Sequence, residues 1–130
     1  MIVVDASVIL RACLSKTGFK ELGDRQLVAP PLLWSEVPSS LHQLLWRQDV
    51  PPRLIEPALE RFLDAEIERS GSPGLIREAW SVAERLGWAK TYDAEYVALA
   101  ESLGCRLLTI DVRLQRGAAR LVDVIGPADL

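Results

Sequence analysis

Short apolar runs alternate along the chain with longer stretches in which apolar residues recur every three or four positions. The clearest runs are residues 2–4, 27–29 and 107–110, and each stops directly before an acidic residue or a proline. Runs with so little polar interruption are typical of strands buried on both faces of a parallel sheet. The alternation with helical stretches predicts an α/β fold of three layers, with a mostly parallel sheet of four to five strands between helices.

Residues 92–111 show this pattern most clearly. Residues 92–103 predict a helix, because apolar side chains recur at helical spacing and a glycine follows the last of them. Residues 105–110 predict a short buried strand that ends at Asp111. Asp93 therefore lies at the start of the helix and Asp111 at the end of the strand, where open α/β sheets place their ligands.

The remaining elements follow from the same spacing rules. Helices are predicted at residues 6–14 and 75–86, and a further helix begins between Pro52 and Pro57 and runs to about Ala65. Residues 112–119 predict a short basic helix or a turn, and residues 65–69 and 121–125 predict brief strands. The last four residues are predicted to be a loose end. The predicted buried face of the helix at 75–86 consists of Ile76, Ala79, Trp80, Ala83 and Leu86.

Residues 32–46 are rich in leucine and tryptophan but contain Pro38. Proline removes a backbone donor and clashes with the preceding turn of a helix. We therefore expect either a kink near Glu36 or a helix that starts only at Pro38. Glu36 lies among apolar residues, so its side chain either faces solvent or is held inward for a purpose.

Composition limits the classes of protein that the chain can belong to. With 130 residues, 49% hydrophobic and 25% charged, it is predicted to form one domain over residues 1–130. It shows no apolar run long enough to cross a membrane and no secretory signal, so we expect a cytoplasmic protein. Cys13 and Cys105 lie in apolar patterns that favour two buried free thiols over a disulfide. The net charge of −3 argues against a simple electrostatic grip on nucleic acid.

Four acidic residues can meet at one edge of the predicted sheet. Right-handed crossovers place the ends of the first strand and of the strand before Asp111 at the same edge, so Asp5 and Asp111 can approach each other. The helix that begins near Asp93 runs antiparallel to that strand and starts over the same edge, and Glu36 has access to it. Taken singly, Asp5, Asp93 and Asp111 could instead cap helices, and Glu36 could be solvated.

Convergence of these acids would have a chemical consequence. Clustered carboxylates repel one another, and a cation makes such an arrangement tolerable. Ligation by oxygen alone, without histidine or cysteine nearby, indicates Mg²⁺ or Mn²⁺ rather than zinc. Four basic residues near the same edge could bind backbone phosphates or simply be solvated, and these are Arg11, Lys90, Arg113 and Arg116.

Several motifs together resemble one protein family. The matching segments are Ile2-Val3-Val4-Asp5-Ala6-Ser7, Ala29-Pro30 leading to Glu36, Tyr92-Asp93-Ala94 with Tyr96-Val97-Ala98-Leu99-Ala100, and Leu107-Leu108-Thr109-Ile110-Asp111 with Leu114. In this order, and covering essentially the whole chain, they resemble the PIN-domain ribonucleases, and more narrowly the VapC-type toxins of toxin–antitoxin pairs. One departure is Ser39, where the family usually has an asparagine, directly after the unusual Pro38.

The resemblance implies a fold, an activity and a site. It implies a PIN-like α/β/α domain that hydrolyses RNA phosphodiester bonds with Mg²⁺ or Mn²⁺ as the toxin of a type II pair. The implied catalytic and metal-binding set is Asp5, Glu36, Asp93 and Asp111, of which Asp5 and Asp93 are the expected direct ligands. Ser7 and Thr109 occupy the positions of supporting hydroxyl residues. The implied partners are an RNA substrate, a protein antitoxin and a second copy of the chain.

Two other classes remain open from the residues alone. Phosphotransfer domains also place an aspartate after the first strand, but the phosphatases among them need a second aspartate where this chain has Ser7. The other alternative is a non-catalytic PIN-like module that binds protein or RNA. Such a module predicts no response to metal ions.

Overall fold

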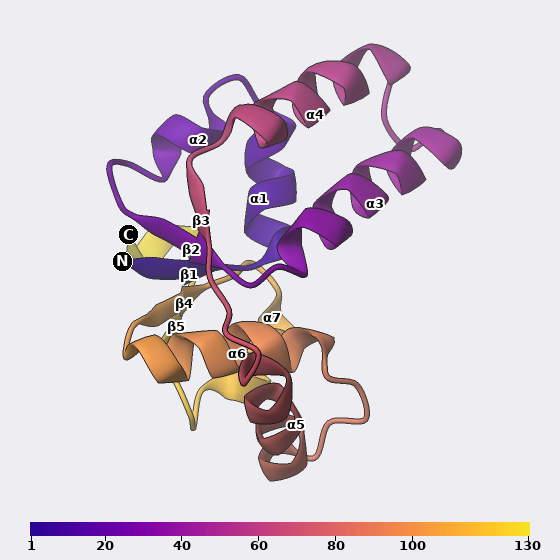
Figure 1. The fold of residues 1–130 in the computed structure, drawn as a ribbon. Helices are drawn as coiled ribbons and strands as arrows, with labels where there is room; N and C mark the ends of the chain where they lie inside the picture. The colour runs from indigo at the N-terminus through magenta and orange to yellow at the C-terminus, as the bar shows by residue number, and fades with distance from the viewer.

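A five-stranded parallel sheet forms the centre of the computed structural model, which describes residues 1–130 (Figure 1). The strand order is β3-β2-β1-β4-β5. The strands are β1 (Ile2–Val4), β2 (Leu27–Ala29), β3 (Ile67–Arg69), β4 (Arg106–Leu108) and β5 (Val124–Ile125). Every pair of neighbours is parallel, which confirms the predicted sheet.

Helices cover both faces of the sheet in three layers, as predicted (Figure 1). One layer contains α1 (Ala6–Cys13), α2 (Gly18–Glu21), α3 (Leu33–Trp46), the 3-10 turn η1 (Pro52–Leu54) and α4 (Ile55–Asp64). The opposite layer contains α5 (Leu75–Leu86) and α6 (Tyr92–Leu103). α7 (Val112–Ala118) packs against β5, and a second 3-10 turn, η2 (Pro127–Asp129), ends the chain.

The register of β1 and β4 fixes the position of the acidic residue that follows β1. Val4 pairs with Leu108, and the amide of Asp5 donates to the carbonyl oxygen of Leu108 over 3.2 Å. Asp5 therefore lies beside Thr109, directly beyond the ends of the two central strands. Because all the strands are parallel, this edge is also the one where α1 and α7 begin.

The helix that contains Pro38 differs from expectation. α3 begins at Leu33 and continues through Pro38, so a helix that starts only at the proline is wrong. Its first turn is closed by short-range bonds, including one of 3.0 Å from the Leu33 amide to the Pro30 carbonyl oxygen. Val37 and Leu41 are buried on either side of the proline, and this packing compensates for the missing donor. Glu36 is consequently held on a continuous helix.

The buried face of α5 was also mispredicted. Ile76 and Trp80 are 75% and 62% exposed. The side chains that face the core are instead Leu75, Ala79, Val82 and Ala83. The predicted and the observed face both contain Ala79 and Ala83, so helical spacing alone cannot decide which of the two faces is buried. Packing of α5 against α6 selects the face that includes Leu75 and Val82.

The ends of the last elements are shifted. β4 stops at Leu108, and Asp111 is the residue that caps α7 rather than the last residue of a strand. β5 covers only Val124–Ile125 of the predicted 121–125. The expected loose end forms a 3-10 turn in which the Gly126 amide donates to Asp129 Oδ2 over 2.9 Å.

Both cysteines are free, as predicted, although only Cys13 is fully buried and Cys105 is partly exposed. Burial raises the pKa of the Cys13 thiol to about 12. None of the helices combines the length and the apolar character that a membrane-spanning helix requires.

Candidate active site

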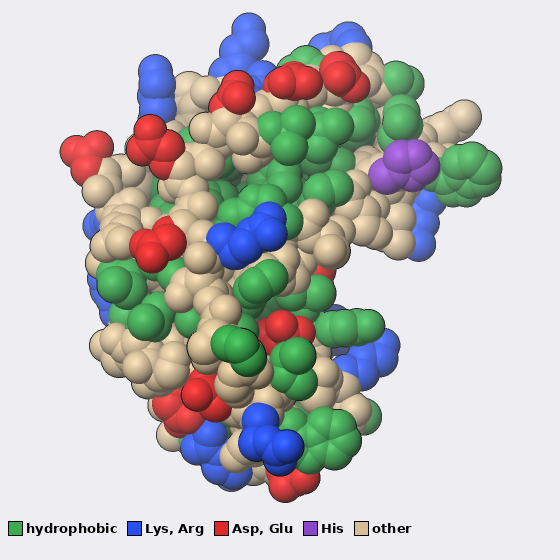
Figure 2. All heavy atoms as spheres, in the orientation of Figure 1, with side chains coloured by type: hydrophobic (Ala, Val, Ile, Leu, Met, Phe, Trp, Pro, Cys, Tyr) green, Lys and Arg blue, Asp and Glu red, His purple; other side chains and the backbone are tan.

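A pocket of about 260 Å³ opens at the carboxyl edge of the central strands. Figure 2 shows a hollow in the surface between the projecting α3 and the layer of α5 and α6, with an acidic side chain visible at its inner end. The pocket is lined by Asp5, Ala6, Ser7, Leu10, Glu36, Ser40, Asp93, Tyr96 and Asp111. The structure thus brings the four acids singled out in the sequence to one pocket, from the starts of α1, α6 and α7 and from the first turn of α3.

Asp5 is the most buried of these acids, with 6% of its surface exposed. Its Oδ1 accepts a hydrogen bond of 3.2 Å from the Val8 amide and so caps α1. The same oxygen accepts from Ser7 Oγ over 2.6 Å, and Oδ2 accepts from Thr109 Oγ1 over 2.6 Å. Burial raises the pKa of the Asp5 carboxyl, and these hydrogen bonds act in the opposite direction. Asp5 therefore serves as a helix cap and lines the pocket at once.

Ser7 and Thr109 connect the two central strands behind Asp5. Their hydroxyl oxygens lie 3.3 Å apart. Ser7 Oγ accepts from the Ile110 amide over 3.3 Å, and Thr109 Oγ1 accepts from the Asp111 amide over 3.0 Å. Each hydroxyl therefore donates to Asp5 and accepts from the backbone that leads to Asp111. The pair fixes both the orientation of one carboxylate and the path of the chain toward another.

Glu36 is oriented by a residue of a different helix. Tyr96 is 1% exposed, and its hydroxyl donates to Glu36 Oε1 over 2.5 Å. Partial burial raises the pKa of Glu36, and the negative charges of Asp93, Asp5 and Glu95 raise it further, whereas the Tyr96 hydrogen bond lowers it. The exposed Ser39, which departs from the family pattern, does not line this pocket, but Ser40 does.

Asp93 lines the pocket and is the most exposed of the four acids. It is the second residue of α6, and Thr91 rather than Asp93 occupies the cap position. Partial burial raises the pKa of Asp93, and the nearby negative charge of Asp111 raises it further, while the positive charge of Arg113 lowers it. The capping interpretation of Asp93 is therefore wrong, and its carboxylate is not committed to the helix end.

Asp111 does cap a helix. Its Oδ1 accepts from the Arg113 amide over 2.9 Å and from the Leu114 amide over 3.4 Å. Both bonds engage the same oxygen at the start of α7. As at Asp5, the cap places the carboxylate on the pocket wall, because the helix begins at the edge where the pocket opens.

Only two of the four basic candidates lie beside the acids. Lys90 and Arg113 line a groove of about 600 Å³ that adjoins the pocket. Arg11 lines a separate pocket, together with residues of α2. Arg116 is exposed on α7 and lines neither the acidic pocket nor the groove. Arg11 and Arg116 lie in the last turns of α1 and α7, whereas both helices begin at the edge where the acids lie.

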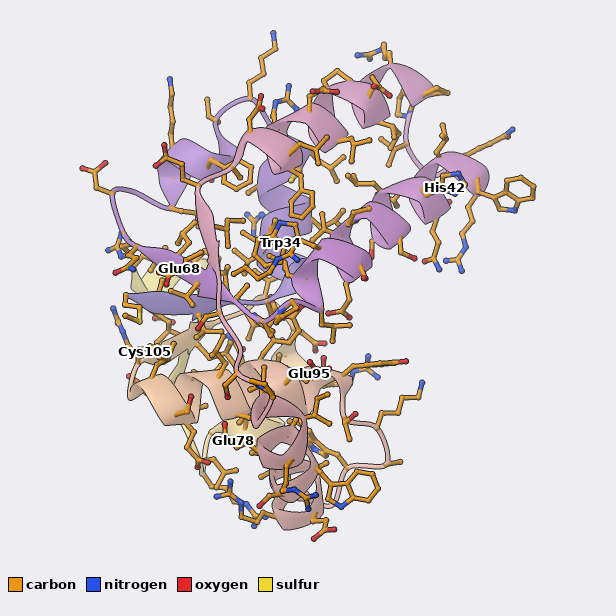
Figure 3. All side chains as sticks on the ribbon, in the orientation of Figure 1. Trp34, His42, Glu68, Glu78, Glu95 and Cys105 are labelled. Carbon is orange, nitrogen blue, oxygen red and sulfur yellow. The ribbon has the colours of Figure 1, made fainter.

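Three residues near the acids were not assigned to the site from the sequence, although Tyr96 belongs to one of the motifs that resemble the family. Tyr96 and Ser40 line the pocket, and the charge of Glu95 acts on Glu36. Figure 3 shows Glu95 on the first turn of α6. The spacing of Asp93 and Tyr96 was an available signal, because residues three apart share a helix face. The pairing of Tyr96 with Glu36, across 60 positions of sequence, had no local signal.

The donor atoms of the pocket are the kind that Mg²⁺ and Mn²⁺ prefer. They are carboxylate and hydroxyl oxygens, and the only histidine, His42, lies toward the far end of α3 with its side chain exposed (Figure 3). No three acidic, histidine or cysteine side chains converge closely enough to chelate an ion by themselves. Mg²⁺ commonly keeps several water ligands and takes only one or two carboxylates. The chemistry of the pocket therefore fits an ion held partly through water.

Comparisons with known proteins agree with this architecture. The PIN domain family model matches residues 2–120. The chain is 37% identical over 115 residues to the VapC ribonuclease Mb0985 of Mycobacterium bovis, and the match covers 88% of each chain. The fold resembles that of PAE2754 from Pyrobaculum aerophilum, with a TM-score of 0.76 and 21% identity over 98% of this chain and 90% of that one.

A second solved structure with this fold is a toxin–antitoxin complex from Klebsiella pneumoniae. Its TM-score is 0.69 at 14% identity, and the match covers 98% of each chain. At such identity the likeness concerns the fold alone. The match to the family model over nearly the whole length and the 37% identical relative show family membership as well as fold. The chain therefore belongs to the PIN-domain family and, within it, to the VapC proteins.

Proposed function

We propose that this protein is a ribonuclease that hydrolyses phosphodiester bonds in RNA with the help of Mg²⁺ or Mn²⁺, and that it acts as the toxin of a type II toxin–antitoxin pair. The observation that carries the proposal is the pocket that four carboxylates from four helices share. The 37% identical relative is a VapC ribonuclease, and this similarity supports RNA as the substrate.

The roles of the four acids follow from their surroundings. Asp5 and Asp93 would hold the ion directly, since Asp5 is fixed by two hydroxyls and Asp93 is not engaged by a helix end. Glu36 and Asp111 would hold it through water. When bound, such an ion supplies positive charge that offsets the phosphate and activates water for attack at phosphorus.

The chain itself supplies orientation and a proton acceptor. Ser7 and Thr109 keep the Asp5 carboxylate turned into the pocket, and Tyr96 does the same for Glu36. The pKa of Glu36 is raised by burial and by the neighbouring acids. Tyr96 engages only Oε1 of Glu36, so we assign Oε2 of Glu36 the proton of the attacking water.

A protein antitoxin and a second copy of this chain are proposed as partners. Support comes from the toxin–antitoxin complex with the same fold and from large apolar side chains on the surface. Trp46 is 81% exposed and Leu63 is 63% exposed, and exposed apolar groups of this size mark contact surfaces when they cluster. Light scattering on the purified chain tests the homodimer by its molar mass.

The decisive experiment is digestion of total RNA with mapped ends. Wild-type protein with Mg²⁺ or Mn²⁺ should produce discrete ends, while Asp93→Ala and the wild type in EDTA should not. Asp64→Ala removes an exposed aspartate of α4 and should cleave like wild type. If wild-type protein yields no ends that Asp93→Ala lacks, the ribonuclease proposal is overturned in favour of a non-catalytic binding module.

A further inference from the structure

The groove beside the acidic pocket contains groups that the proposed reaction does not use. It has a volume of about 600 Å³ and shares Glu36, Asp93 and Asp111 with the neighbourhood of the pocket. The rest of its lining comes from the segment between α5 and α6 and from the start of α7: Gly87, Trp88, Ala89, Lys90, Tyr92, Arg113 and Leu114. A strand of substrate that passes the acids would continue into this groove.

Two aromatic residues line the groove, and they differ in how they are held. Trp88 is half-buried and packs on α7 so closely that a Cβ on Gly117 would lie 2.8 Å from its ring. Tyr92 is 58% exposed. Trp88 therefore forms a fixed wall of the groove, whereas the ring of Tyr92 remains available for contact with a ligand.

Tyr92 shares the groove with the reactive acids. It directly precedes Asp93, in the first turn of α6, and both residues line the groove together with Asp111. A substrate strand whose cleaved phosphate lies at these acids would therefore pass the ring of Tyr92 close to that phosphate. The ring is in a position to contact a neighbouring base.

The charges of the groove complement a nucleic acid backbone. Lys90 lies two residues before Tyr92, and Arg113 lies close enough to Asp93 to lower its pKa. The groove thus combines an exposed ring with two cations. Proteins that bind single strands combine the same two elements, stacking for the bases and positive charge for the phosphates.

We propose that Tyr92 stacks on the base next to the cleaved phosphate of a single-stranded RNA, with Lys90 and Arg113 binding the flanking phosphates. This inference rests on the proposed ribonuclease activity and adds a residue that binds and positions the substrate. A duplex would keep its bases stacked on one another, so the groove favours an unpaired segment.

Steady-state cleavage by Tyr92 variants tests the inference. The probe is a synthetic single-stranded RNA that spans a cleavage site mapped in total RNA. Tyr92→Leu removes the aromatic face but keeps apolar bulk, and should raise KM by about tenfold to a hundredfold, as the loss of one stacked base does, with kcat changed much less. Tyr92→Phe keeps the face and should behave like wild type. Trp80→Leu, at an exposed aromatic residue outside the groove, should also leave KM unchanged.

A substrate that lacks one base identifies the partner of Tyr92. When the nucleotide beside the cleaved phosphate is abasic, wild type and Tyr92→Leu should show the same KM. Equal KM values for the two proteins on the intact RNA, with cleavage retained, would overturn the stacking inference and leave the ribonuclease proposal standing. Absence of cleavage by the wild type would overturn both. Melting curves of the variants establish that each one is folded.

Discussion

Asp5 combines a structural and a chemical position in one carboxylate. Oδ1 accepts from the Val8 amide and from Ser7, and Oδ2 accepts from Thr109. These donors offset part of the cost of removing the charge from water, yet burial still raises the pKa of Asp5. A bound cation would stabilise the charged carboxylate of Asp5, as these hydrogen-bond donors do. The stability of the protein should therefore report on ion binding at this residue.

The first prediction concerns the melting temperature. Millimolar Mn²⁺ or Mg²⁺ should raise it, because an ion that binds only the folded state stabilises by about 2.7 kcal/mol at a hundredfold excess over Kd. For a chain of 130 residues, this corresponds to a rise of roughly 10 °C. Asp5→Asn should abolish the rise, since it removes the charge while keeping the shape of the side chain. Differential scanning calorimetry measures both.

The readout is the ion-induced shift of each protein and not its absolute stability, because Asp5→Asn also removes a repulsive charge. Asp64→Asn, at an exposed residue of α4, serves as the matched control and should keep the full shift. A wild-type melting curve that is the same with and without the ions would remove the metal from the proposed reaction.

The second prediction concerns pH and Glu36. Its pKa is raised above the ordinary value of 4.5, so between 4.5 and the folded-state pKa the native protein binds more protons than the unfolded chain. Stability of the metal-free protein should therefore fall as pH rises through this window and stay level above it. Glu36→Gln keeps an acceptor for Tyr96 but cannot ionise. Its stability relative to wild type should grow with pH across the same window.

Urea unfolding in EDTA at several pH values measures this difference. Glu60→Gln, at an exposed position on α4, provides the comparison and should show no such growth. A Glu36→Gln difference that is constant with pH would mean that Glu36 is not strained by burial and by neighbouring charges in the folded protein.

At the scale of elements, α1 and α2 approach each other at Gly18. A Cβ at this position would lie 2.5 Å from the Cα of Ala12 and closer still to its carbonyl oxygen. Backbone atoms cannot move aside as a flexible side chain can, so Gly18→Ala should destabilise by about 1–3 kcal/mol. The nearest neighbour of a Cβ at Gly74 is 3.4 Å away, so Gly74→Ala should change stability by less than about 1 kcal/mol. Urea unfolding of the two variants compares them, and equal losses would contradict the close approach.

The elements themselves were largely predictable, because the apolar runs before Asp5 and Asp111 and the helical spacing of residues 92–103 are local signals. The predictions that were wrong concern features that depend on packing against other parts of the fold. Burial of Val37 and Leu41 carries α3 through Pro38, and packing on α6 decides which face of α5 is buried. Neither of these packing contacts can be predicted from the spacing of apolar residues along the sequence.

The candidate site shows the same division. The topology of a parallel sheet was enough to bring Asp5, Glu36, Asp93 and Asp111 to one pocket, since strand ends and helix starts share an edge. The direction in which a long side chain turns was not predictable. Lys90 and Arg113 line the groove while Arg11 lines another pocket.

At the scale of the whole molecule, the protein carries a net charge of −3, and its proposed substrate, RNA, is also negatively charged. Much of the negative charge around the proposed reaction centre belongs to the pocket itself, and only two cations line the adjoining groove. Binding of RNA must then depend less on long-range attraction than it does in basic nucleic-acid-binding proteins. The contributions that remain are the ion, stacking and a few phosphate contacts.

This balance predicts a shallow dependence of RNA recognition on salt. RNA affinity falls as salt rises, and each phosphate contact on a single strand contributes about 0.7 to the magnitude of the slope of log affinity against log salt. Contacts from Lys90 and Arg113 therefore predict a slope with a magnitude of about 1.4. KM for a single-stranded RNA, measured over a range of KCl at constant free Mg²⁺, gives the slope. Lys90→Met and Arg113→Met should each lower it by about 0.7, whereas Arg11→Met should not. A slope near 3 or more would mean that further cations contact the strand, with Arg116 as the next to test, because it lies one helical turn beyond Arg113 on α7.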